Sequence, residues 1–179
     1  MKKVALLGFG LMVVSAAANA ISFNGSAGQD YTHLGFGLGT ETSGLAMTGG
    51  WTHNDDDGDA ASRGLGLNIA LGPFLATVGG KGIYTNPNDG DEGYAAAVGG
   101  GLQWKIGDSF GLFGEYYYSP DSLSSGIDSY EEANAGARWT IMRPITIEAG
   151  YRYLNLAGKD GNRDNALADG PYVGVSAGF

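Results

Sequence analysis

The stretch Pro171-Tyr-Val-Gly-Val-Ser-Ala-Gly-Phe179 ends the chain and decides the fold class. Every second residue from Val173 to Phe179 is apolar, and the residues between them are small or polar. This period of two is typical of a β-strand with one apolar face. In a water-soluble sandwich such a terminal strand would be an exposed edge, whereas in a closed membrane barrel it pairs with the first strand. The stretch therefore favours a transmembrane β-barrel.

Residues 1–20 have the three parts of a secretory signal peptide. A basic start at Lys2 and Lys3 precedes an apolar run, and small residues lead to Ala20. We predict cleavage after Ala20, because this order of parts is what secretory signals share. The mature chain would then be residues 21–179, which is 179 − 20 = 159 residues and enough for one barrel domain. With 0 Cys, the sequence offers neither a disulfide framework nor a lipid-attachment site.

The predicted mature chain is strongly acidic. Without the two lysines of the signal peptide it carries 10 − 2 = 8 basic residues and 19 acidic ones, so its net charge is 8 − 19 = −11. This balance argues against a nucleic-acid partner, which would need a basic face, and it permits cations as partners. The sequence also contains no apolar run long enough to span a bilayer as a helix.

Ten segments with apolar residues at every second position follow the signal peptide. From the second segment onward, short turns such as Gly72-Pro73 alternate with long polar connections. Outer-membrane barrels place tight turns on the periplasmic side and long loops outside. We therefore predict an all-β fold, a closed antiparallel transmembrane barrel of 10 strands (8 if the first two short segments are misread), with both termini periplasmic and the long loops extracellular. The predicted long connections are His53–Ser62, Asn86–Gly93, Ser119–Asp128 and Leu156–Asp169.

Aromatic residues on the apolar faces sort into two levels. Between them the apolar faces carry Val, Leu, Ile, Ala and Gly, so the pattern predicts two aromatic girdles that flank an aliphatic band. A soluble sandwich would bury its aromatic residues in the middle of the strands instead. The predicted periplasmic girdle is Phe74, Trp104, Phe110, Trp139 and Phe179, and the predicted outer girdle is Trp51, Tyr84, Tyr94, Tyr116, Tyr118, Tyr151 and Tyr153.

Four stretches of the mature chain resemble a known family. They are Asn54-Asp-Asp-Asp-Gly-Asp-Ala60, Asp89–Gly101, Phe113–Gly126 and Gly158-Lys-Asp-Gly-Asn-Arg-Asp-Asn165. In these stretches the chain resembles the YfaZ family of enterobacterial outer-membrane proteins, and the resemblance covers essentially the whole mature chain. It implies a porin-like barrel in the outer membrane of a Gram-negative bacterium, but it implies no substrate, activity or functional residue.

The expected partners follow from this location. Lipid and lipopolysaccharide of the outer membrane would surround the barrel. The C-terminal strand is similar to the closing strands of outer-membrane barrels, in which a terminal Phe helps the barrel assembly machinery to recognise the chain. Pro171 interrupts the alternation, so the match to that signal is partial. The sequence gives no indication of an oligomeric state.

The opposite faces of the strands carry ionisable residues together with many glycines. If the Met142–Pro144 turn centres its hairpin, Arg138 lies opposite Glu148 and Asn134 lies opposite Arg152. Such residues can fill a small barrel and fix its register, or they can form a charged constriction that selects solutes. Phe113, Tyr117 and Tyr172 could occupy the volume that the glycines leave. The predicted lumen and constriction residues are Lys81, Glu115, Glu132, Asn134, Arg138, Glu148 and Arg152.

The outer loops are acidic, and Asp55, Asp57 and Asp59 are candidates for a weak divalent-cation site. Their Asp-x-Asp-Gly spacing resembles a calcium loop, but the full pattern needs acids at positions that hold His53 and Gly64. Asp-Gly pairs are also ordinary turn formers, so solvated turns are the favoured interpretation. We predict no other cofactor.

The sequence favours a channel over an enzyme. A catalytic barrel needs a His beside a nucleophile, and the chain has 2 His residues, neither of which lies in a recognisable catalytic motif. We therefore predict a non-enzymatic barrel, most simply a narrow porin-like channel for small solutes with a charged, Gly-lined lumen. The alternative is a non-conducting barrel with a structural or surface-binding role through its acidic outer loops.

Overall fold

The computed structural model describes residues 21–88 and 91–179. The predicted signal peptide lies outside the described residues, so its cleavage stays a prediction. A 3-10 helix, η1 (Asp121–Leu123), interrupts the strands, and no helix within these described ranges is long and apolar enough to cross a membrane. The strands are β1 (Ile21–Gly28), β2 (Tyr31–Leu38), β3 (Gly44–Asn54), β4 (Gly58–Leu71), β5 (Phe74–Pro87), β6 (Gly93–Ile106), β7 (Phe110–Ser119), β8 (Ser124–Ser125), β9 (Ile127–Met142), β10 (Ile145–Gly158) and β11 (Asn165–Gly178).

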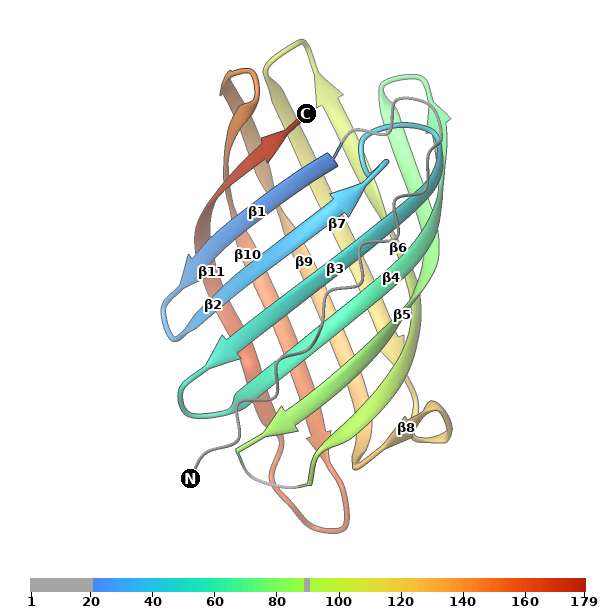
Figure 1. Ribbon diagram of the computed structural model, residues 1–179, viewed down its shortest axis with the longest axis vertical. Helices are drawn as coiled ribbons and strands as arrows, with labels where there is room; N and C mark the ends of the chain where they lie inside the picture. The colour runs from blue at the N-terminus through green and yellow to red at the C-terminus, as the bar shows by residue number, and fades with distance from the viewer. Residues whose placement is uncertain (1–20, 89–90) are drawn as a thin grey trace.

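All the strands belong to one antiparallel sheet that closes on itself (Figure 1). The sheet contains 11 strands, but β8 has 2 residues and pairs only with the end of β6, so 11 − 1 = 10 strands form the barrel wall. Pairing of β1 with both β2 and β11, together with pairing of β5 with β6, completes the circle. The predicted closed barrel of ten strands is confirmed.

The C-terminal stretch closes the barrel against the first strand. In the register of β1 and β11, Phe23 lies opposite Ala177 and Ala27 lies opposite Val173. The backbone N–H of Ile21 donates to the carbonyl of Phe179 at 3.0 Å, and the N–H of Phe179 donates back at 2.8 Å. The last strand therefore has no free edge, because its backbone groups pair on both sides.

The two ends of the barrel differ. The short-turn end carries the connections β2–β3, β4–β5, β6–β7 and β9–β10, and the loop end carries the others. At the loop end the strands run further than the sequence predicts: the expected loop His53–Ser62 shrinks to Asp55–Asp57, and Leu156–Asp169 shrinks to residues 159–164. The boundaries were wrong because strand ladders are made by backbone groups and continue through polar residues.

Apolar side chains cover the outside of the barrel. Leu45 is 75% exposed and Val78 is 65% exposed, which would be unfavourable against water and fits contact with lipid. Phe74 pairs with Trp104 at the short-turn end, and Tyr84 pairs with Tyr94 near the loop end. The predicted girdle residues are exposed except Tyr153, which is half-buried, and the sequence analysis overlooked Phe23, an exposed ring near the short-turn end.

The hydrophobic core lies inside the barrel, in the half nearer the loop end. Leu156 of β10 and both Leu167 and Ala168 of β11 are 0% exposed. Tyr130 from β9 and Ile83 from the opposite wall pack in the same cluster. We call this cluster of Ile83, Tyr130, Leu156, Leu167 and Ala168 the interior core.

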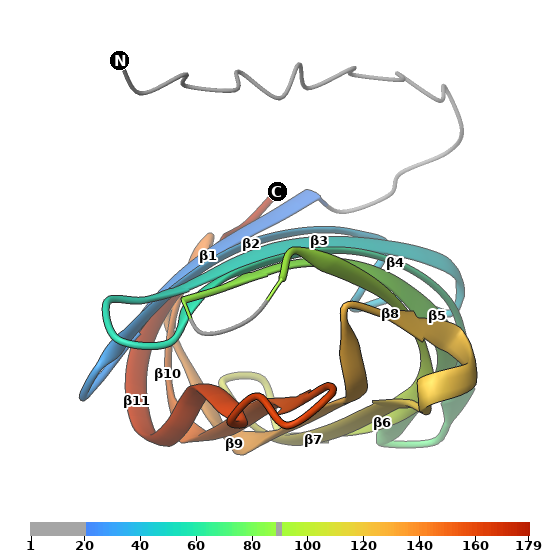
Figure 2. The same ribbon diagram turned by 90° about the horizontal axis from the view of Figure 1, so that it is seen from below.

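The loop-end half of β11 bends inward to form this core. The Asn54 side-chain amide of β3 donates to the carbonyl of Leu167 at 3.3 Å, although β1 and β2 separate these strands in the sheet. The Tyr31 hydroxyl of β2 likewise donates to the carbonyl of Gly170 at 3.4 Å. Figure 2, viewed from the loop end, shows the β10–β11 connection bending inward over the barrel opening.

Candidate functional site

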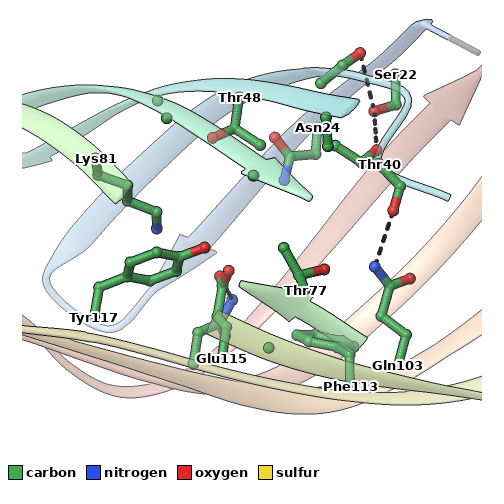
Figure 3. Close-up of a pocket in the computed structure, with 18 of the residues that line it drawn as sticks. Ser22, Asn24, Thr40, Thr48, Thr77, Lys81, Gln103, Phe113, Glu115 and Tyr117 are labelled. Atoms are coloured by element: carbon green, nitrogen blue, oxygen red, sulfur yellow. Dashed lines mark hydrogen bonds between the residues drawn. The ribbon is translucent and has the colours of Figure 1, made fainter. Parts of the chain in front are cut away.

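A polar cavity of about 200 Å³ lies inside the barrel (Figure 3). It extends from Ser22 and Thr40 at the short-turn end to Lys81, Glu132 and Arg152. All seven predicted lumen residues line its wall, and each of them comes from a strand face that points inward. They are Lys81, Glu115, Glu132, Asn134, Arg138, Glu148 and Arg152.

Three aromatic rings on the inner wall are each paired with a cation. The Lys81 Nζ atom lies 3.9 Å from the centre of the Tyr117 ring. The Arg138 guanidinium lies 4.2 Å from the centre of Phe113, and the Arg152 guanidinium lies 5.1 Å from that of Tyr172. These distances place each cation where the ring quadrupole attracts it.

Glycines of neighbouring strands make room for the same rings. A Cβ atom added to Gly136 would lie 3.0 Å from Cζ of Phe113, and one added to Gly150 would lie 3.0 Å from Cε1 of Tyr172. A Cβ atom at Gly99 would lie 2.8 Å from Cδ1 of Tyr117. Part of the volume left by the inward glycines is therefore filled by aromatic side chains.

An ion pair crosses the lumen. The Lys81 ammonium of β5 donates to Oε2 of Glu132 on β9 at 2.8 Å, and β6 and β7 separate these strands in the wall. The Tyr130 hydroxyl donates to the same carboxylate oxygen at 2.8 Å. Both partners of the ion pair are almost completely buried, so the pair fastens two walls of the barrel to each other.

The hairpin of β9 and β10 has the register that the sequence analysis expected. Arg138 lies opposite Glu148, and Arg138 Nε is 3.4 Å from Glu148 Oε2. Asn134 lies opposite Arg152, but it is hydrogen-bonded elsewhere: its amide donates to Glu115 Oε1 at 3.1 Å and its carbonyl accepts from the Tyr172 hydroxyl at 2.9 Å. The backbone register could be predicted from the turn, whereas the side-chain partner of Asn134 could not.

The β2–β3 connection folds inward at the short-turn end. The Asn68 side-chain amide donates to the carbonyls of Gly39 and Thr42, both at 2.9 Å. The Gln103 amide donates to the carbonyl of Thr40 at 3.0 Å, and the Thr40 hydroxyl lies 3.3 Å from that of Ser22 (Figure 3). The sequence analysis did not identify these residues as part of the site, since only the folded turn brings them together.

Polar contacts join the connections at the loop end. Arg163 Nη2 donates to Asp57 at 3.0 Å, which joins the β10–β11 connection to the β3–β4 connection. Lys159 Nζ donates to Asp121 at 2.6 Å, and this carboxylate raises the pKa of Lys159 above its ordinary value. The connections therefore brace one another over the interior core.

The geometry gives no support to a metal site at the acidic loop. Asp55 and Asp59 lie on either side of the His53 ring, at 3.1 and 2.9 Å, while Asp57 binds Arg163. Within residues 21–88 and 91–179, no group of three or more His, Asp and Glu residues could hold a metal ion. Weak divalent-cation binding at these loops stays a prediction.

Among the described residues, neither histidine has the hydrogen-bond partners that a catalytic relay requires. His33 Nδ1 lies 2.9 Å from the Thr52 hydroxyl in the lumen, and in the part of the chain that the structure describes no carboxylate bonds to His33. His53 bonds to Asp59, with no hydroxyl nucleophile bonded to it among the same residues. A relay needs the nucleophile, the base and the orienting acid together, so neither histidine has the full set.

Comparisons with known proteins agree with the fold. A family model described as "YfaZ precursor" matches residues 1–179. The Outer membrane protein YfaZ of Escherichia coli (strain K12) is 77% identical over 180 residues, which cover 100% of both chains. A solved structure of the NanC porin in a rhombohedral crystal form has a TM-score of 0.50 and 8% identity, covering 90% of this chain and 99% of that one. At this identity the porin shows a shared barrel fold alone.

Proposed function

Because the chain belongs to the YfaZ family of outer-membrane proteins, we propose that it is a porin-like barrel with a closed resting state. Its polar cavity admits small solutes from the short-turn end, and the interior core blocks their passage toward the loop end. The observation that carries this proposal is the complete burial of Leu156, Leu167 and Ala168 inside the barrel. The short-turn end faces the periplasm and the loop end faces the outside, as in other outer-membrane barrels.

Apolar packing is a strong barrier to polar solutes. A hydrated ion or sugar that entered the interior core would lose its water without gaining hydrogen bonds, which is costly. Hydrophobic constrictions close channels in this way, because water leaves them. The Asp57–Arg163 and Lys159–Asp121 ion pairs support closure by holding the loop-end connections together.

A continuously open narrow channel is the second candidate function. The observation that favours it is the ionisable inner wall, in which Lys81, Glu132 and Arg138 would offer charge to a passing solute. The barrel shared with the NanC porin is compatible with either candidate. A barrel that acts only through its acidic outer loops is the remaining alternative.

Planar-bilayer recordings test the closed state. We expect purified wild-type protein to give no resolved conductance steps. The Leu156→Ala/Leu167→Ala variant should give steps, because it removes side-chain volume from the interior core. The matched control is Leu45→Ala/Leu67→Ala, which removes equal volume from the lipid-facing surface and should behave like wild type.

Each outcome of the recordings separates the candidates. Conductance steps in the wild type would overturn the closed state and favour the open channel. Silence in all three proteins, with folding checked by heat-modifiable migration in gels, would show that the interior core is not the seal. The structural or surface-binding alternative would then be favoured.

The partners of the barrel are also proposals. Lipid and lipopolysaccharide would contact the exposed aliphatic band and the girdles, and the assembly machinery would recognise the β11 strand, which leads to an exposed Phe179. The exposed apolar outer surface supports the first of these, and the chain's C-terminal aromatic residue supports the second.

A further inference from the structure

Arg152 stands out among the cations of the cavity. Its side chain is 3% exposed, and its Nε and Nη1 atoms have no hydrogen-bond partner among the described residues. Lys81 is neutralised by Glu132 and Arg138 by Glu148. In residues 21–88 and 91–179, no ion pair joins Arg152 to a carboxylate. Buried charges in proteins are normally paired, so a buried guanidinium with free N–H groups is suited to an anionic partner from outside the chain.

The surroundings hold this guanidinium in place. The Tyr172 ring lies 5.1 Å from Arg152, and the Tyr172 hydroxyl is fixed by its hydrogen bond to Asn134 at 2.9 Å. Asn134 is fixed in turn by Glu115 at 3.1 Å. A preorganised guanidinium loses little side-chain freedom on binding, which favours a specific ligand contact.

The acidic residues of the cavity limit the charge of the ligand. Glu132 and Glu148 are engaged by Lys81 and Arg138, and Glu115 accepts a hydrogen bond from Asn134. These carboxylates would still repel a molecule with several negative charges. One small negatively charged group fits Arg152 better, since a planar guanidinium matches the oxygens of carboxylate and phosphate.

We propose that the cavity binds a small oxyanion, a carboxylate or a phosphate, through the Arg152 guanidinium. The cavity volume of about 200 Å³ accommodates a molecule of a few carbon atoms. The inference rests on the proposed function only in that the solute enters from the short-turn end. Binding itself requires the cavity and Arg152, whether or not the barrel conducts.

The test is a titration of ¹⁵N-labelled protein in detergent micelles, followed through the Arg152 Nε–H signal in NMR spectra. Propionate and inorganic phosphate are the anionic probes, and propionamide is the neutral probe of the same shape as propionate. We expect a saturable shift of the signal with at least one anion and none with propionamide. The signal is assigned by its absence from Arg152→Gln and from Arg152→Lys, neither of which has a guanidinium Nε–H group at this position.

Variants separate recognition by Arg152 from a general effect of charge. Arg152→Gln should weaken anion binding at least tenfold, measured by competition or calorimetry, and Arg152→Lys should retain part of it. Arg63→Gln makes the same charge change at an exposed residue of β4 outside the cavity wall, and it should bind like wild type. If Arg152→Gln fails to fold, the wild-type titration and Arg152→Lys still decide the question.

Two results would overturn the proposal. One is the lack of a saturable shift with both anions, and the other is equal binding by wild type and Arg152→Gln. A shift with propionate alone would assign the site to carboxylates, and a shift with phosphate alone would assign it to phosphates. Conductance of the wild-type barrel would contradict the closed state and leave this equilibrium measurement untouched, so the two proposals fail separately.

Discussion

Individual side chains on the inner wall form a repeated unit of glycine, aromatic ring and cation. Gly150, Tyr172 and Arg152 make one such unit, in which the ring fills the space above the glycine and faces the guanidinium. The ring attracts the cation and shields it from water. The glycines and the charges on the inner wall thus belong to the same packing arrangement.

The Arg138–Glu148 pair gives a prediction at this scale. Both Arg138→Ala and Glu148→Ala should destabilise the barrel in urea unfolding, and Arg138→Ala should cost more. The reason is that Glu148 is 3% exposed and would lose its cation, whereas Arg138 is 32% exposed and keeps Gln103 and the Phe113 ring. The double variant should cost less than the sum of the single ones by roughly 0.5–3 kcal/mol.

Additive free energies of unfolding would mean that the two side chains do not interact. Thr140→Ala and Glu148→Ala provide the matched control pair, because Thr140 lies on the same two-strand hairpin but is paired with Thr146. Their effects should add.

The inward face of β10 changes from polar to apolar along the strand. In β10 the outward Tyr151 alternates with the inward Arg152, but further along the same inward face carries Leu154 and Leu156, both buried. The inner face is therefore polar in the middle of the barrel and apolar toward the loop end. A bulge between Leu154 and Asn155 in the pairing with β11 accompanies the change. This reversal creates the interior core.

Close contact between strands predicts the effect of a single methyl group. A Cβ atom at Gly99 of β6 would overlap the backbone carbonyl oxygen of Tyr116 and crowd the Tyr117 ring. Gly99→Ala should therefore destabilise the barrel by about 1–3 kcal/mol in urea unfolding followed by Trp fluorescence. At Gly82 of the neighbouring strand the nearest atom would be 4.0 Å away, so Gly82→Ala should be neutral or slightly stabilising. Equal stability of the two variants would contradict this account.

The whole molecule is a barrel with its own connections bonded inward at both ends. The β2–β3 connection is bonded to Asn68 and Gln103 at the short-turn end, and ion pairs brace the connections at the loop end. Between them lie the polar cavity and the interior core. Since the proposed function has solutes entering at the short-turn end, a pore open from end to end would need the interior core and the loop-end connections to move.

The orientation of this molecule in the membrane can be tested by labelling. The chain has 0 Cys, so an introduced cysteine is the only thiol. Asp56→Cys, at an exposed position of the loop end, should react with a membrane-impermeant maleimide in intact cells. Ser109→Cys, at an exposed position of the short-turn end, is the matched variant and should react only after the outer membrane is disrupted. The opposite pattern would invert the proposed topology.

The sequence alone determined the barrel, its ten strands and the Arg138–Glu148 register, because the alternation of residues with period two and the turn positions are local properties of the chain. It also contained the alternation of Arg152, Leu154 and Leu156, but Leu156 was assigned to the predicted loop Leu156–Asp169, so the continuation of the strand was missed. Only the tertiary structure decided that β11 bends inward, that Lys81 reaches Glu132 across the lumen and that Nε and Nη1 of Arg152 have no hydrogen-bond partner among the described residues. These features depend on contacts between strands that are not neighbours, and no local pattern in the sequence records which walls of a closed barrel meet inside it.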